Sequence, residues 1–245
     1  MKPSPNPPSE PGPLVAFGAH PDDIEFACGG VVAIETRAGR SCHFVVCSKG
    51  EAATRGTPDQ RAAEAEAGAR ILNASLRFLS LGGDAHLERR VEHAIELARV
   101  LREVRPELVL APSTVPDQHP DHAALGDLVR QAARLARYGG VKELSGLPPH
   151  AIRQLLFYAV TPGAEPTESG RILVDVSDPA VLDAWTRSMN AHGSQTSHLH
   201  YVELQLARAR MLGLAASVGH AIPLFANDSI VVNSLDAVAR GARAF

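Results

Sequence analysis

The sequence predicts an α/β fold in a single domain, with a Rossmann-like, mostly parallel sheet and helices on both of its faces. Short apolar segments alternate with helical patterns over the first two thirds of the chain, as in consecutive βαβ units. Segments 14–19 and 108–111 are apolar without a break, as parallel strands covered on both faces are. The 245 residues suffice for one large domain, and no repeat or linker divides them.

Four strand–helix pairs account for the first part of the domain. The predicted strands are 14–19, 43–47, 76–81 and 108–111. The predicted helices are 24–38, 57–72, 87–104 and 121–137. Gly39 ends the first helix, and Pro106 stops the third. The second helix begins with Thr57 as N-cap, followed by Pro58 and Gln60 at favoured positions.

The last third of the chain continues with strands and helices in a less regular order. Its predicted strands are 154–160, 171–176 and a last short one at 229–232. Its predicted helices are 178–192 and 199–213. Residues 161–166, rich in proline and glycine, form a turn between the first two of these strands. His192, His198, His200 and Tyr201 cluster in this part of the chain and could reach the site, but we expect them at the surface or in an interface.

Composition argues against several classes of partner. The net charge of −3 and the aromatic content of 4% favour neither nucleic acid nor an anionic membrane surface. Apolar stretches stay below the roughly 18 residues of a membrane span. Residues 1–13 form a Pro-rich lead-in, expected to be disordered, without the apolar core of a signal peptide. Cys42 and Cys47 lie in or beside an apolar run, so we expect buried thiols and a cytoplasmic protein.

Two similar tetrapeptides follow the first and the fourth predicted strands. They are His20-Pro21-Asp22-Asp23 and His119-Pro120-Asp121-His122. In open α/β sheets, ligands bind in the loops at the carboxyl ends of the strands. Two clusters of histidine and aspartate in equivalent loops therefore predict one shared metal site.

Residues of these motifs can supply a complete set of metal ligands. Catalytic zinc is held by three imidazole or carboxylate ligands, and its fourth position is left to water. Such a set is available in His20, Asp23 and His122. The same donors also accept Fe²⁺, Co²⁺ or Mn²⁺. The alternative is structural: Asp22, Asp23 and Asp121 could simply cap the two helices that follow.

The remaining residues of the motifs are candidates for acid–base chemistry. Asp22, next to a ligand, could accept the proton of a metal-activated water that attacks a carbonyl. His119 could stabilise the oxyanion or protonate the leaving amine. Asp121 could hold the ring of His119 in one tautomer.

The paired motifs resemble those of the PIG-L/LmbE-like zinc-dependent N-deacetylases. The resemblance covers about residues 14–190. It extends to these segments: Gly29-Gly30, Ser48-Lys49-Gly50-Glu51, Arg55-Gly56-Thr57, Arg61 and Glu64-Ala65. For this chain it implies Zn²⁺ on His20, Asp23 and His122. It also implies Asp22 as general base, His119 supported by Asp121, and Arg55 as a substrate contact.

The resemblance also implies a substrate class. The expected substrate is a small N-acetylglucosamine conjugate, and similarity leans toward the deacetylases of N-acetylglucosaminyl-malate in bacillithiol biosynthesis. Relatives form trimers or hexamers, so a homo-oligomer is expected. Some relatives carry a tyrosine two residues before the motif histidine, where this chain has Asp117. Alternatives are an amidase of thiol–sugar S-conjugates and a non-hydrolytic nucleotide-binding protein, although the latter would need a Gly-rich loop after the first strand.

Overall fold

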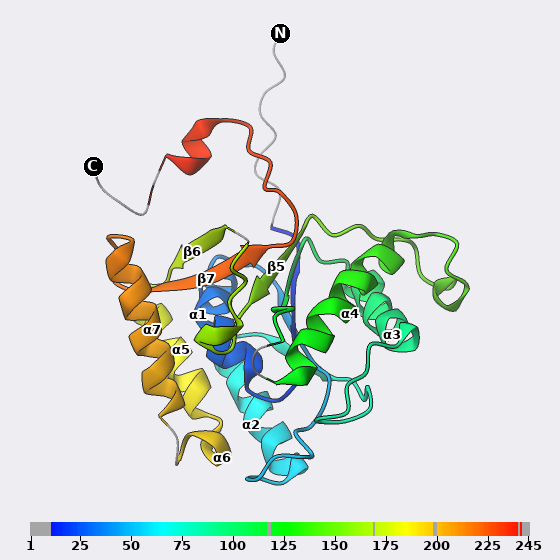
Figure 1. Cartoon of the computed structure of the whole chain (residues 1–245), viewed down its shortest axis with the longest axis horizontal. Helices are drawn as coiled ribbons and strands as arrows, with labels where there is room; N and C mark the ends of the chain where they lie inside the picture. The colour runs from blue at the N-terminus through cyan, green and yellow to red at the C-terminus, as the bar shows by residue number, and fades with distance from the viewer. Residues whose placement is uncertain (1–10, 117–118, 169, 198–199, 240, 242–245) are drawn as a thin grey trace.

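Seven strands form one sheet in the order β3-β2-β1-β4-β5-β7-β6 in the computed structural model (Figure 1). The structure describes residues 11–116, 119–168, 170–197, 200–239 and 241. The strands are β1 (Leu14–Gly18), β2 (Cys42–Val46), β3 (Ser75–Phe78), β4 (Leu108–Pro112), β5 (Gln154–Tyr158), β6 (Arg171–Asp175) and β7 (Ala221–Ala226). Strand β7 runs antiparallel to both of its neighbours, and the other pairs are parallel. The predicted mostly parallel α/β fold is therefore confirmed.

Helices cover both faces of this sheet (Figure 1). One face carries α1 (Asp23–Arg37), α2 (Pro58–Ile71), α5 (Pro179–Asn190) and α7 (Tyr201–Ala215). The other carries α3 (Val91–Val104) and α4 (Pro120–Arg137). The short elements are α6 (Gly193–Thr196) and the 3₁₀ turns Lys142–Leu144, Pro162–Ala164 and Leu235–Val238. Alternate residues of β1 enter opposite cores, which explains its unbroken apolarity.

The pairing of β1 with β4 brings the two sequence motifs together. These strands are parallel neighbours, with Leu14 opposite Leu108 and Ala16 opposite Leu110. Their carboxyl ends therefore open at the same edge of the sheet, and the loops that follow them lie side by side. This single feature of topology joins residues about a hundred positions apart in sequence.

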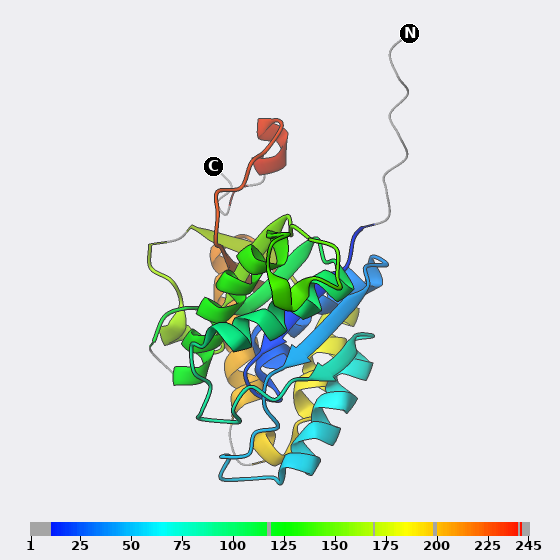
Figure 2. The same ribbon diagram turned by 90° about the vertical axis from the view of Figure 1, so that its right-hand side faces the viewer.

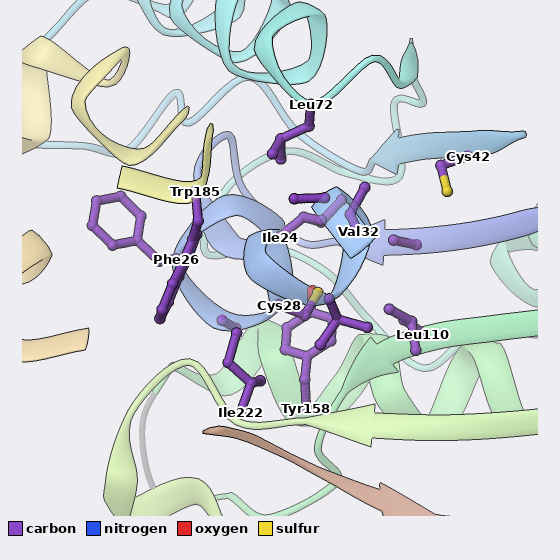
Figure 3. Packing of buried hydrophobic residues seen from close by; sticks show 14 of the residues in the cluster. Ile24, Phe26, Cys28, Val32, Cys42, Leu72, Leu110, Tyr158, Trp185 and Ile222 are labelled. Carbon is purple, nitrogen blue, oxygen red and sulfur yellow. The ribbon is translucent and has the colours of Figure 1, made fainter. Parts of the chain in front are cut away.

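Helix α1, which begins with Asp23, packs unusually close to its neighbours. A Cβ atom added at Gly29 would lie 2.8 Å from Cδ1 of Trp185, and one at Gly30 would lie 2.8 Å from Cδ1 of Ile222. The indole of Trp185 is buried against α1 (Figure 3) and donates a hydrogen bond of 2.8 Å to the backbone oxygen of Glu25. The glycine pair thus lets α5 lie directly on the helix that begins at the site.

Replacing Trp185 by alanine is expected to lower the free energy of unfolding by about 3–5 kcal/mol, the usual cost of truncating a buried large aromatic residue. Urea unfolding followed by circular dichroism measures this change. Arg187→Ala is the control, because Arg187 is exposed on the same helix and pairs with exposed Asp183. Its expected effect is below about 1 kcal/mol. Equal losses in the two variants would contradict the packing argument.

Two predicted elements differ most from the observed ones, and the strand predicted at 76–81 ends earlier, at Phe78. The strand predicted at 229–232 is wrong: the last strand is β7, and residues 230–232 are exposed on the segment that leaves the sheet (Figure 1, Figure 2). The sequence pattern did not predict this strand because it contains Pro223, and proline disfavours the interior of a sheet. Proline is tolerated at this position because β7 pairs with β5 only at Phe225 and Ala226. The helix predicted from Leu87 begins at Val91, which leaves a longer loop after β3.

The structure also bears on the predictions for a membrane span, the cysteines and the N-terminal tail. Within the described ranges, no helix is long and apolar enough to cross a membrane. All three cysteines, Cys28, Cys42 and Cys47, are buried and unpaired. Most of the predicted tail, residues 1–10, lies outside the described residues, and Gly12 already donates a hydrogen bond to Glu107. The homo-oligomer and the cytoplasmic location stay predictions.

Candidate metal centre

Three buried side chains direct ligand atoms toward one point at the carboxyl ends of β1 and β4. They are His20 from the loop after β1, Asp23 from the first turn of α1, and His122 from the first turn of α4. Nδ1 of His20 lies 3.2 Å from Nε2 of His122. Oδ1 of Asp23 lies 3.0 Å from the same Nε2. Two imidazoles and a carboxylate therefore converge as a metal site requires.

The other polar atoms of two of these side chains are held by neighbours. Oδ2 of Asp23 accepts hydrogen bonds from the backbone N–H groups of Ala19, at 2.8 Å, and His20, at 2.9 Å. Nε2 of His20 faces two carboxylates, Oδ1 of Asp84 at 3.1 Å and Oδ2 of Asp121 at 3.3 Å. A histidine that binds a metal commonly donates its second N–H to a carboxylate in this way.

Charge at this point also fits a divalent cation. Burial lowers the pKa of His20, but the carboxylates of Asp23, Asp121 and Asp84 raise it by a larger amount. The resulting pKa of His20 is about 12. Burial raises the pKa of Asp23, but His122 and His20 outweigh this and hold it well below its usual range. The carboxylates thus strongly favour positive charge between them, which a metal supplies without ring protons.

A second group of side chains shares His20 and is also close enough to hold an ion. It consists of His20, Asp84, His119 and Asp121. The carboxylate of Asp121 is already engaged, since Oδ2 accepts from the N–H of Ala85 at 2.7 Å and Oδ1 from that of Leu87 at 3.4 Å. Nε2 of His20 points to this group, whereas Nδ1 points to Asp23 and His122. The first group is the ligand set predicted from the sequence, and the two groups share His20.

Asp22 occupies the N-cap position of α1 but does not cap the helix. Its side chain makes no capping hydrogen bond, and its φ is 109°, a region that non-glycine residues rarely adopt. The carboxylate instead accepts a hydrogen bond of 3.2 Å from Nη2 of Arg61. Burial and the charge of Asp23 raise the pKa of Asp22 to about 6, against the opposing effect of Arg61. Asp22 therefore does not cap the helix that follows it, contrary to the structural alternative.

His119 is held in one tautomer, though not by the expected group. Its Nδ1 accepts a hydrogen bond of 3.3 Å from the backbone N–H of Asp121 and so caps α4. The neutral ring must then carry its proton on Nε2. Burial and the charge of His20 lower the pKa of His119, which favours this neutral form. The carboxylate of Asp121 is 3.9 Å from Nδ1 of His119 and lies nearer to His20.

Comparison with known protein families agrees with this arrangement. The family model described as PIG-L, GlcNAc-PI de-N-acetylase, matches residues 15–133, the stretch that contains both motifs. The chain belongs to the PIG-L family.

Individual relatives of this PIG-L protein carry different activities. A 4-oxalmesaconate hydratase from Pseudomonas putida is 31% identical over 150 residues, which are 55% of this chain and 58% of the hydratase. A 1D-myo-inositol 2-acetamido-2-deoxy-alpha-D-glucopyranoside deacetylase from Catenulispora acidiphila is 27% identical over 212 residues, covering 71% of this chain and 69% of that enzyme. A conserved protein from Thermus thermophilus superimposes with a TM-score of 0.79 at 31% identity, over 89% of this chain and 96% of that one.

The site opens into a cavity of about 430 Å³ at the same edge of the sheet. Its lining includes His20, Asp22, Asp23, His119 and His122, so the structure brings these predicted residues together. Asp121 lies directly behind them, buried against His20.

Arg55, the predicted substrate contact, does not line this cavity. Its side chain is exposed, and its backbone oxygen accepts a hydrogen bond of 3.1 Å from Nε2 of Gln195. The arginine in the cavity wall is Arg61, from the first turn of α2. Nη2 of Arg61 also donates to the backbone oxygen of Pro21 at 2.8 Å. The predicted N-cap at Thr57 fixes the start of α2 and thereby the position of the Arg61 guanidinium.

Two residues of the cavity, Asp84 and Tyr201, were not assigned to the site from the sequence. Asp84 follows Gly82 and Gly83, whose φ angles of 103° and 94° let the loop after β3 turn back to His20. Tyr201 was expected at the surface or in an interface, yet it lines the cavity from the start of α7. Neither position has a periodic pattern that predicts its contact.

Histidines of the last third divide between the interior and the solvent. His192 was expected at the surface or in an interface, but it is 1% exposed, with Nε2 3.3 Å from Oε1 of buried Glu25. His200 is exposed, as predicted. His198 and Asp117, the residue in place of the relatives' tyrosine, lie outside the described residues.

Proposed function

We propose that this protein is a metal-dependent hydrolase that removes the N-acetyl group from a small N-acetylglucosamine conjugate. The observation that carries the proposal is the carboxylate of Asp22, which stands in the cavity beside the convergent ligand atoms without belonging to them. The ligands would be His20, Asp23 and His122, and the metal Zn²⁺, with Fe²⁺, Co²⁺ or Mn²⁺ accepted by the same donors. A bound divalent metal lowers the pKa of water to about 7 and polarises an amide carbonyl.

Asp22 is the proposed general base. With a pKa of about 6, it is mostly ionised at neutral pH and still basic enough to take a proton. As the water oxygen bonds to the acetyl carbon, its proton passes to the carboxylate of Asp22. The same proton then goes to the sugar nitrogen as the C–N bond breaks. The immediate products are acetic acid and the free amine, so atoms and charge balance, and the acid then passes its proton to the amine or to solvent to give acetate.

His119 is the proposed stabiliser of the oxyanion. Because Nδ1 accepts the N–H of Asp121, the Nε2 proton is free to be donated toward the cavity. A donor placed at the developing oxyanion is typically worth about 3–4 kcal/mol of the activation barrier. The carboxylate of Asp121 then accepts the Nε2–H of His20 and so acts through His20. The backbone N–H of Asp121 orients His119.

A hydratase activity is the second candidate, favoured by the 31% identity with the Pseudomonas putida hydratase. Adding water to a carbon–carbon double bond would use the same base, but no C–N bond would break. The S-conjugate amidase differs from the leading proposal only in its leaving group. A nucleotide-binding role is disfavoured, because the loop after β1 presents Asp22 and Asp23 where a phosphate would lie.

Acetate release by the purified protein tests the leading proposal. The protein is stripped with chelator, reloaded with Zn²⁺, Fe²⁺, Co²⁺ or Mn²⁺ in turn, and assayed with N-acetylglucosamine glycosides and a thiol–sugar S-conjugate. Release of acetate that is lost on stripping and restored by metal is the expected result. Activity that persists after complete removal of metal would exclude this mechanism. Water addition to 4-oxalmesaconate without acetate release would support the hydratase instead.

A further inference from the structure

We infer that the substrate carries an apolar, uncharged group beside its acetamido sugar, and that Tyr201 and Leu204 of α7 bind this group. The inference rests on the proposed function and adds the chemistry of the aglycone, the part of the substrate attached to the sugar. It is drawn from the apolar residues that line the cavity together with the metal ligands.

The cavity is lined by charged and by apolar side chains. The charged ones are the metal ligands with Asp22, Arg61, Asp84 and His119. The apolar ones are Phe26, Ala52, Ala53, Val160, Tyr201 and Leu204. Small-molecule sites commonly combine a few polar groups, which fix orientation, with an apolar wall, which supplies binding energy.

Tyr201 and Leu204 are held in place yet left open to solvent. They lie one turn apart at the start of α7, with 43% and 44% of their surfaces exposed. The ring of Tyr201 packs edge-on against buried Phe26, with centroids 6.0 Å apart. Buried Gln205 fixes the same turn, since its Nε2 donates to the backbone oxygen of Val160 at 2.7 Å. An apolar group seated here would bury this surface, which is favourable in proportion to the area covered.

Charges in the cavity disfavour an anionic aglycone such as malate. Among the described lining residues, Arg61 is the one lysine or arginine, against three aspartates. Its guanidinium already donates to the backbone oxygens of Gly50 and Pro21 and to Asp22. Besides the proposed metal, a dicarboxylate would therefore meet three carboxylates and one guanidinium that is already shared among other acceptors. This argues against the N-acetylglucosaminyl-malate predicted from the resemblance.

Turnover of matched glycosides tests the inference. The zinc-loaded protein is assayed with the methyl, phenyl and malyl glycosides of N-acetylglucosamine, in both anomers. We expect kcat/KM for the phenyl glycoside to exceed that for the malyl glycoside by at least about tenfold, the effect of burying part of one large apolar group. Preference for the malyl glycoside would overturn the inference.

Variants on α7 test whether Leu204 produces the preference for the phenyl glycoside. Leu204→Ala is expected to lower kcat/KM for the phenyl glycoside by about tenfold while changing that for the methyl glycoside less than about twofold. Leu214→Ala is the matched control, since Leu214 is 60% exposed on the same helix but does not line the cavity. Equal losses for both glycosides in Leu204→Ala would contradict a role in aglycone binding.

Binding measured without turnover separates this inference from the proposed function. Calorimetric titration of the Asp22→Asn variant with the phenyl and malyl glycosides reports aglycone preference even where no acetate is released. If the wild-type protein releases no acetate from any glycoside, the proposed deacetylase activity is excluded. Tighter binding of the phenyl glycoside than of the malyl glycoside, weakened by Leu204→Ala, would still support the apolar subsite. Tighter binding of the malyl compound would defeat the subsite alone.

Discussion

Replacing Asp22 by asparagine is expected to slow acetate release by about 10²–10⁴-fold, the usual contribution of a general base. The amide keeps the shape of the carboxyl group but cannot accept a proton from water. The backbone should tolerate the change, because asparagine adopts positive φ more readily than most residues, and φ at this position is 109°. Steady-state kcat, measured together with the metal content of the same sample, checks the prediction.

Metal content decides how the result is interpreted. Asp22 is not in the proposed ligand set, so Asp22→Asn should bind metal as the wild type does. Asp59→Asn, at an exposed acid in the first turn of α2, is the control and should leave both rate and metal unchanged. A fully active Asp22→Asn enzyme would remove the base from the mechanism. Loss of metal together with activity would place Asp22 among the ligands.

Replacing His122 by alanine is expected to weaken metal binding by more than about 100-fold, beyond what loss of a residue outside the ligand set usually costs. His122 supplies Nε2, which lies 3.2 Å from Nδ1 of His20 and 3.0 Å from Oδ1 of Asp23. Truncation leaves one imidazole and one carboxylate, an incomplete set for zinc. Competition with a chromogenic chelator measures the affinity, and elemental analysis the content.

His119→Ala is the informative partner of this variant. Both histidines lie at the start of α4, but His119 belongs to the second group of ligand atoms and His122 to the first. We expect His119→Ala to retain metal and to lose activity by about 10²–10³-fold, as loss of an oxyanion donor does. Metal lost from His119→Ala but kept by His122→Ala would move the ion to the group with Asp84 and Asp121. His43→Ala, on β2 away from the cavity, should change neither property.

Local sequence patterns predicted the central strands and the motifs at their ends. Continuous apolarity marked β1 and β4, and the capping residues at Thr57 marked α2. The same reasoning failed at β7, where Pro223 interrupts the strand, and around Leu87, where a charged amphipathic pattern extended beyond the true start of α3. Such patterns report the environment of a segment, not the partner that creates it.

The sequence by itself determined which side chains could hold a metal and that they would meet, because parallel strands present their carboxyl ends at one edge. Tertiary structure alone decided which ring nitrogen of His20 faces His122, and that Asp121 holds His20 with its carboxylate and His119 with its backbone. It also brought Asp84 and Tyr201 into the cavity. These contacts depend on how a loop and a distant helix pack, and neither has a periodic pattern that encodes its partner.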